Sequence, residues 1–169
     1  MRILLLAISF LAANSAVSGS KFDRLDKFYL GGGVSAIDVG ANGSDLDLSY
    51  SSLEIIGGYK YSGFLSLDAR LTLGNDSGDD SGDTKLYTGS VYWRPETANE
   101  IAKTYGLLGF TAASIRDSDD SYSRSGFSYG AGIGFTITEA WNINFEVRKV
   151  LDHSDLDLET FSAHIDYRF

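Results

Sequence analysis

From Phe28 to the last residue, apolar and polar side chains alternate in eight separate segments of the chain. A period of two residues is the pattern of a β-strand, because successive side chains of a strand point to opposite faces of its sheet. Most segments are about 11–14 residues long, whereas strands in globular proteins average about 5–6 residues and tilted strands that cross a membrane need about 9–11. The predicted strands are residues 27–37, 49–61, 64–74, 84–94, 103–115, 125–138, 141–151 and 158–169. The pattern therefore predicts an all-β chain whose strands are long enough to cross a membrane.

The two faces of these strands differ in chemistry. In the sixth segment Phe127, Ile133 and Phe135 share one face, and small or hydroxyl residues occupy the other. We expect the apolar faces to contact lipid and the opposite faces to line an interior, where charges of both signs can pair across the lumen. The ionisable residues of this inward face are Glu54, Lys60, Asp68, Arg70, Arg94, Glu146, Arg148, Asp166 and Arg168. The alternation does not fix the facing of Leu107 and Leu108.

Strands that cross a lipid bilayer must close on themselves, because the backbone groups of an open sheet edge find no water there. Eight strands close with an interior just wide enough to be filled by side chains. The predicted fold is an eight-stranded antiparallel up-and-down transmembrane β-barrel with a polar, plugged lumen. A soluble lipocalin-like carrier also has alternating strands, with its apolar face inward, and alternation alone leaves that alternative open.

The connections between the segments favour the membrane barrel. Short breaks at Ser62–Gly63 and around Glu139–Ala140, and a medium break near Pro95–Ala102, alternate with long breaks. The long breaks are residues 38–48, 75–83, 116–124 and 152–157. Outer-membrane barrels have long outer loops and short periplasmic turns, with both termini on the periplasmic side. The long breaks hold thirteen aspartates against Arg116 and Arg124. These aspartates are Asp38, Asp45, Asp47, Asp76, Asp79, Asp80, Asp83, Asp117, Asp119, Asp120, Asp152, Asp155 and Asp157.

Aromatic residues gather near the predicted periplasmic ends of the strands. Tyrosine and tryptophan favour the headgroup level of a membrane, because each joins an apolar ring to a polar group. The residues expected in this belt are Tyr59, Tyr61, Phe64, Trp93, Tyr105, Trp141, Tyr167 and Phe169.

The N-terminus has the pattern of a secretory signal peptide. Arg2 supplies the positive charge, an apolar run follows from Ile3 to Ala13, and Ala16 and Ser18 are the small residues expected before a cleavage site. The apolar run is too short to cross a bilayer as a helix, which needs about 20 residues. We therefore expect a signal peptide over residues 1–18 and a barrel domain over residues 19–169.

Composition excludes several classes of function. Cysteine is absent and only two histidines occur, so we expect no disulfide, no metal site and no cofactor. The formal net charge of −9 argues against nucleic acid as a partner. The acidic run from Asn75 to Asp83 offers oxygen ligands for Ca²⁺, but it lacks the spacing and the terminal glutamate of an EF-hand.

The last strand ends on alternating apolar residues, Phe161, Ile165, Tyr167 and Phe169. This ending resembles the C-terminal signature of outer-membrane barrels, which the barrel assembly machinery recognises. The glycine-rich stretch from Phe28 to Val34, and the pair of stretches from Tyr129 to Phe135 and from Trp141 to Val147, are similar to strands of the small outer-membrane β-barrel family of the OmpA-domain and OmpX/Ail type. The resemblance covers nearly all of residues 27–169. It implies a location in the outer membrane of a Gram-negative bacterium, with outer-membrane lipid, lipopolysaccharide and the assembly machinery as partners.

The expected function is a structural and surface-interaction role without catalysis, with the acidic loops available to an extracellular ligand. One alternative is a small passive porin-like channel. Another is a hydrolase that modifies lipid A. The run of His153, Ser154 and Asp155, with Glu159 after it, contains the histidine, serine and glutamate that outer-membrane lipid A deacylases use. Those enzymes separate the histidine and serine by one residue, whereas here the two are adjacent.

Overall fold

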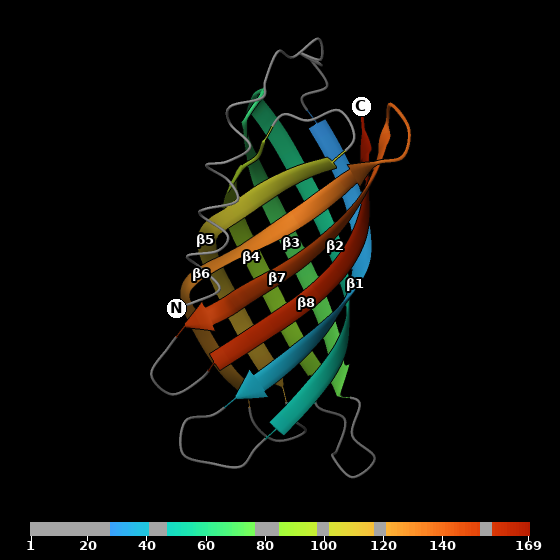
Figure 1. Ribbon diagram of the computed structural model, residues 1–169. Coiled ribbons are helices and arrows are strands. Elements are labelled where there is room, and N and C mark those ends of the chain that lie inside the picture. The colour runs from blue at the N-terminus through green and yellow to red at the C-terminus, as the bar shows by residue number, and fades with distance from the viewer. Residues whose placement is uncertain (1–27, 41–46, 77–84, 98–101, 117–120, 153–156) are drawn as a thin grey trace.

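The computed structural model describes residues 28–40, 47–76, 85–97, 102–116, 121–152 and 157–169. Within these residues the chain forms eight strands that wrap around one axis at a steep tilt (Figure 1). The strands are β1 (Phe28–Gly40), β2 (Asp47–Ser62), β3 (Leu65–Asp76), β4 (Lys85–Pro95), β5 (Ala102–Arg116), β6 (Ser121–Thr136), β7 (Trp141–Asp152) and β8 (Asp157–Arg168). The described residues contain no helix that is long and apolar enough to cross a membrane. The predicted signal peptide, residues 1–18, lies outside the described part of the chain.

The sheet is a closed antiparallel barrel in which each strand pairs with its neighbours in sequence. The first and last strands close it, with a β1–β8 ladder that runs from the Tyr29–Arg168 pair to the Gly40–Asp157 pair. Beyond the last paired residue, the Phe169 backbone N–H donates to the Phe28 carbonyl at 3.0 Å. Closure gives each strand a partner on both sides, and the predicted eight-stranded barrel is confirmed.

The two ends of the barrel differ. At the turn end, where β1 begins and β8 ends, the connections are residues 63–64, 96–101 and 137–140. At the loop end they are residues 41–46, 77–84, 117–120 and 153–156, which lie outside the described residues.

The predicted long breaks are partly wrong, because the strands extend into them. The break expected at residues 116–124 shrinks to 117–120, since β5 continues to Arg116 and β6 begins at Ser121. Outside the hydrocarbon core of the membrane, the backbones of serine and charged residues pair in a β-ladder as readily as those of apolar residues. Polar side chains therefore do not show where a strand ends. Five of the thirteen aspartates assigned to loops therefore lie in strands: Asp38, Asp47, Asp76, Asp152 and Asp157.

The β6–β7 ladder is shorter than the strands that form it. It runs only from the Tyr129–Lys149 pair to the Thr136–Asn142 pair. On the other side, β6 pairs with β5 as far as Ser121. The β5–β6 hairpin thus projects at the loop end beyond β7, and among the described strands its outer part, Ser121–Ser128, pairs with β5 alone.

Apolar side chains cover the outside of the barrel. Phe135 and Ile165 are exposed, whereas Arg70, Glu146 and Arg148 are buried inside, which is the reverse of a soluble carrier. The sequence did not show which of the two adjacent leucines, Leu107 and Leu108, points inward. Leu107 is 1 % exposed and points into the lumen, whereas Leu108 is 49 % exposed and faces outward. A pattern interrupted by two adjacent leucines cannot give this facing, because either one continues the alternation.

Aromatic rings line the outside of the turn end. Phe28 packs on Tyr59 with ring centroids 4.9 Å apart, and Trp141 packs on Tyr167 at the same separation. Tyr105 was expected in this belt, and that prediction is wrong: its side chain is fully buried in the lumen. Its strand pairs with β4 and β6 in a register that turns Tyr105 and Leu107 inward together.

Two glycines make room for luminal tyrosines. A side chain at Gly58 would occupy the space taken by the Tyr29 ring, and one at Gly132 would meet the Tyr105 ring. Glycine at these two positions lets a tyrosine lie flat against the backbone of a neighbouring strand. The large aromatic side chains therefore fit inside a narrow eight-stranded barrel.

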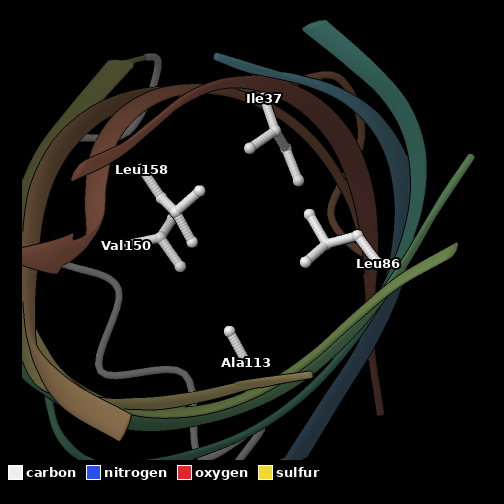
Figure 2. Close-up of a cluster of buried hydrophobic side chains, with 5 residues drawn as sticks. All are labelled: Ile37, Leu86, Ala113, Val150 and Leu158. Atoms are coloured by element: carbon white, nitrogen blue, oxygen red, sulfur yellow. The ribbon is translucent and has the colours of Figure 1, made fainter. Parts of the chain in front are cut away.

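The loop end of the lumen is apolar. Side chains from five strands point inward there and form a buried cluster, with Ile115 packed against it (Figure 2). We call this group the apolar cap; its members are Ile37, Leu86, Ala113, Val150 and Leu158.

Candidate functional site

Charged and hydroxyl side chains fill the lumen between the apolar cap and the turn end. Nearly all of them come from the inward positions of their strands, as the alternation requires. All nine ionisable residues predicted for the inward face lie on that side of the barrel wall. Buried among them are Glu54, Asp68, Arg70, Arg94, Glu146, Arg148 and Asp166, whereas Lys60 and Arg168 are half-buried.

Arg70 of β3 is the centre of the network. Its guanidinium donates to both carboxylate oxygens of Glu146 on β7, from Nη1 to Oε2 at 2.5 Å and from Nη2 to Oε1 at 3.0 Å. It also donates to Asp68 at 2.8 Å and lies 3.4 Å from Glu54. In a closed barrel of eight strands, β3 and β7 lie on opposite walls, so the Arg70–Glu146 pair crosses the whole lumen.

A second crossing runs between β7 and β2. Arg148 donates from Nη2 to Glu54 Oε2 at 2.6 Å, and its Nε lies 3.5 Å from Glu146. Each glutamate therefore contacts both arginines. Tyr105 adds a hydroxyl hydrogen bond of 2.7 Å to Glu146, so this carboxylate is held from three directions. Buried charges are stable only when paired and hydrogen-bonded in this way.

Nearer the turn end, Arg94 of β4 joins polar and aromatic partners. It lies 3.6 Å from Asp68 and donates to the Asn144 side chain at 3.3 Å. Its guanidinium carbon lies 3.7 Å from the centre of the Tyr105 ring, which is a close cation–π contact. Tyr29 contributes a hydrogen bond from its hydroxyl to Asp68. Asn144 in turn donates to Asp166 at 2.9 Å, which links β7 to β8.

Glu96 lies at the turn-end mouth of the lumen, directly after β4, and is surrounded by cations. Lys60 contacts it at 2.6 Å, Arg94 at 3.7 Å and Lys103 at 4.0 Å. Burial alone would raise the pKa of the Glu96 carboxyl, but the positive charges of Lys103, Arg94 and Lys60 outweigh that effect and lower its pKa to about 2. This carboxylate is therefore ionised at any physiological pH.

A layer of hydroxyl groups separates the ionic network from the apolar cap. The Ser90 and Thr111 hydroxyls are 2.7 Å apart, and Thr111 donates to Ser128 at 3.0 Å. On the opposite side the hydroxyls of Ser35 and Ser52 are 2.6 Å apart. From the turn end outward, the lumen thus passes from ionic to hydroxyl to apolar side chains.

Several members of the network were missed by reasoning from the sequence. Glu96 and Lys103 flank a connection, where the alternation is interrupted and gives no facing. Tyr29 and Tyr105 have aromatic side chains, which the polar-inside rule assigns to the lipid. Asn144 has the inward parity of Glu146, so the alternation does place it in the lumen, but it gives no partner for it.

The residues considered for catalysis do not form a described site. His153, Ser154 and Asp155 lie outside the described residues, and Glu159 is exposed on the outer face of β8. His164 lies in the lumen, 3.7 Å from Glu146, as a neighbour of the ionic network. In the described residues most luminal charges contact one another, and the Arg70–Glu146 and Arg148–Glu54 ion pairs link different walls of the barrel.

The structure is similar to solved outer-membrane barrels. Neisserial surface protein A matches with a TM-score of 0.66 and 16 % identity, over 84 % of this chain and 97 % of that one. Ail, the attachment invasion locus protein of Yersinia pestis, gives 0.60 and 23 %, over 85 % and 98 %. The outer membrane protein OprG of Pseudomonas aeruginosa gives 0.56 and 13 %, over 85 % and 95 %. At these low sequence identities, the similarity supports the fold alone.

The sequence itself identifies the family. No curated protein matches the chain. The family model described as "Outer membrane protein beta-barrel domain" matches residues 3–169. This match agrees with the closed eight-stranded barrel and its apolar outer face. The chain therefore belongs to the outer membrane protein beta-barrel domain family.

Proposed function

We propose that this integral outer-membrane barrel has a structural and surface-interaction role, without catalysis and with a lumen closed to ions. The ion pairs that cross the lumen are the main support for a closed lumen. Arg70 joins β3 to β7, and Arg148 joins β7 to β2. An ion on its way through the barrel would have to separate these buried pairs and then pass the apolar cap.

Planar-bilayer recording tests the closed lumen. The purified protein is first checked for folding by its gel mobility with and without boiling, and is then added to a bilayer that later receives a known porin. We expect no discrete current steps from this protein at either polarity, followed by clear steps from the porin. Discrete steps from the protein alone would overturn the closed lumen and favour the passive channel.

The loop end supports a role at the cell surface. We place this end outside, as is usual for the longer connections of such barrels. Residues 41–46, 77–84, 117–120 and 153–156 contain eight aspartates and no lysine or arginine. A surface of this charge favours cationic partners. Ail of Yersinia pestis has been crystallised with the heparin analogue sucrose octasulfate, a polyanion; for this chain we propose the opposite preference.

Binding to charged polymers tests the surface role. The protein in neutral phospholipid nanodiscs is titrated with polylysine and with heparin, at low and at physiological salt. We expect salt-sensitive binding of polylysine and none of heparin. Replacing Asp79, Asp80 and Asp83 by asparagine should weaken polylysine binding, and equal binding of heparin would contradict the proposal.

The absence of catalysis is tested on the lipid itself. Lipid A from cells with and without the protein is compared by mass spectrometry, and we expect identical spectra. Loss of an acyl chain only in the presence of the protein would favour the hydrolase, and His153→Ala would then identify the residue responsible.

The C-terminal residues are the proposed assembly signature. Phe161, Ile165 and Phe169 are exposed on the outer face, and the Tyr167 ring packs 5.1 Å from that of Phe169. We expect Phe169→Ala to lower the amount of barrel in the outer membrane while leaving refolding in detergent unchanged.

The proposed signal peptide is tested on the same membrane fraction. N-terminal sequencing of the protein should show cleavage after Ser18.

A further inference from the structure

The lipid-facing wall is hollowed near the loop end. A groove of about 820 Å³ crosses β8, β1, β2, β3 and β4 on the outside of the barrel. Its floor is low because Ala36 and Ser51, which are partners in the β1–β2 ladder, both have small side chains. Phe161 of β8, which is the partner of Ala36, and Leu53 of β2 give the groove apolar walls.

A second groove lies beside the first. It has a volume of about 330 Å³ and is lined by Gly89, Ala112 and Ser114, again small residues on the outer face. Leu73 and Tyr87, which are partners in the β3–β4 ladder, line both grooves and form the ridge between them. Two apolar grooves on either side of one ridge suit a ligand with more than one hydrocarbon chain.

Positive charge lies at the loop-end edge of this ridge. Lys85 and Arg116 are direct partners in the β4–β5 ladder, and both are exposed on the outer face. Lys85 lines the larger groove, and the Arg116 guanidinium lies 5.8 Å from the centre of the Tyr87 ring. Both cations therefore lie at the loop-end edge of the ridge, where we expect the headgroup level of the membrane.

The β1 and β8 end of the larger groove has the opposite charge at this level. Asp38 of β1 and Glu159 of β8 are partners in their ladder, and both are exposed on the outer face. A phosphate group near the wall would be repelled there and attracted to Lys85 and Arg116. The charge distribution thus places a phosphate group at the β4–β5 end of the larger groove, beside the ridge.

We propose that the ridge and its two grooves bind one phosphorylated glycolipid of the outer leaflet, with its phosphate at Lys85 and Arg116 and acyl chains in the grooves. The inference names a partner for the proposed surface barrel, and it rests on the placement of the loop end outside. Phosphate is the fitting headgroup because two adjacent cations on a rigid ladder match a charged, multidentate anion. The grooves make the site specific for a lipid, because free phosphate has no group to fill them.

Native mass spectrometry of the protein released from neutral phospholipid nanodiscs tests the proposal. The probes are bisphosphorylated lipid A, the same lipid after enzymatic removal of its phosphates, and inorganic phosphate as a competitor. We expect one retained bisphosphorylated lipid, weaker retention of the dephosphorylated lipid, and no displacement by millimolar phosphate. Displacement by phosphate would overturn the part of the proposal that assigns the grooves.

Variants separate the two parts of the site. Basic residues near a membrane surface each contribute about 1 kcal/mol toward anionic lipid, so Lys85→Gln with Arg116→Gln should weaken lipid A binding by about tenfold or more. Lys149→Gln, a lysine on the outer face of β7 away from the ridge, is the matched control and should bind as the wild type does. Ala36→Phe fills the larger groove and should weaken binding of both lipid forms.

The results distinguish this proposal from the proposed function. Equal binding by the wild type and the Lys85 and Arg116 double variant would overturn the phosphate site while leaving the conductance result unaffected. Conductance in bilayers would overturn the closed lumen while leaving the lipid site intact. Gel mobility with and without boiling confirms that each variant is folded before it is compared.

Discussion

Replacing Arg70 by methionine should destabilise the barrel strongly, because it removes the central cation and leaves its acids in place. Arg70 makes three short hydrogen bonds to carboxylates, two to Glu146 and one to Asp68. Hydrogen bonds to charged groups contribute about 1.5–3 kcal/mol each, so a simple sum would give roughly 5–9 kcal/mol. That sum is an upper bound, because Glu146 keeps Arg148 and Tyr105 as partners. We expect a loss of about 3–5 kcal/mol, which is typical when one member of a buried pair is removed.

Removing both partners should cost less than removing Arg70 alone. In the variant Arg70→Met with Glu146→Met, the remaining acids keep their own cations, since Glu54 contacts Arg148 and Asp68 contacts Arg94. Replacing a buried pair by apolar side chains of similar volume is often nearly neutral. The double variant should therefore be more stable than Arg70→Met.

Urea unfolding in phospholipid vesicles measures these changes. The chain has two tryptophans, Trp93 and Trp141, and both are exposed on the lipid side, so their fluorescence reports loss of membrane contact. Arg124→Met removes an exposed arginine at the projecting end of β6 and should change the free energy of unfolding by less than about 0.5 kcal/mol. An unfolding free energy of Arg70→Met within about 1 kcal/mol of the wild type would contradict the central role of this cation. A double variant no more stable than Arg70→Met would contradict the pairing of Arg70 with Glu146.

Three further predictions concern other parts of the barrel. Because the pKa of Glu96 is lowered in the folded state, this carboxylate stabilises the fold fully above its unfolded pKa of about 4.5 and progressively less as the pH falls toward 2. The stability difference between the wild type and Glu96→Gln should therefore shrink over that range in urea titrations, and a difference that grows on acidification would contradict the assignment. Backbone amides of Ser121–Ser128 should exchange with deuterium faster than those of the paired stretch from Tyr129 to Thr136, and equal protection would mean that the outer part of β6 has another partner. Gly33→Ala should lower the free energy of unfolding by about 1–3 kcal/mol, because the new methyl group meets the β8 backbone. Gly57→Ala has open space around it and should leave the stability unchanged. Thermal unfolding in detergent compares the two variants, and equal midpoints would contradict the packing argument.

The strands could be predicted because the face of the sheet to which each side chain points is a local property of the sequence. Each residue of a strand points opposite to its neighbour, so Phe135 and Arg148 reveal their environments without knowledge of any other strand. Strand ends were predicted less well, as at Arg116 and Ser121, because polar residues continue a ladder without any change in the pattern. The predicted long breaks are therefore longer than the connections between the strands in the structure.

The site could be predicted only as a set of inward residues. Arg70 and Glu146 are separated by 76 residues in sequence, yet they meet across the lumen. Which inward residues meet depends on the stagger of each strand against its neighbours, and that stagger accumulates around the closed barrel. The grouping of Lys60 and Lys103 around Glu96, from three different parts of the chain, follows from the same stagger.

The order of the residues is enough to establish that the chain forms long alternating strands, that these strands must close, and that apolar side chains cover the outside while charges lie within. It could do so because alternation is written residue by residue, and because lipid excludes an open sheet edge. The folded barrel was needed to establish which way Leu107 and Tyr105 point, which groups pair with each luminal charge, and where the two grooves beside Tyr87 lie. Each of these depends on the register between strands, since a shift of two residues would leave every facing unchanged and alter every contact across the lumen.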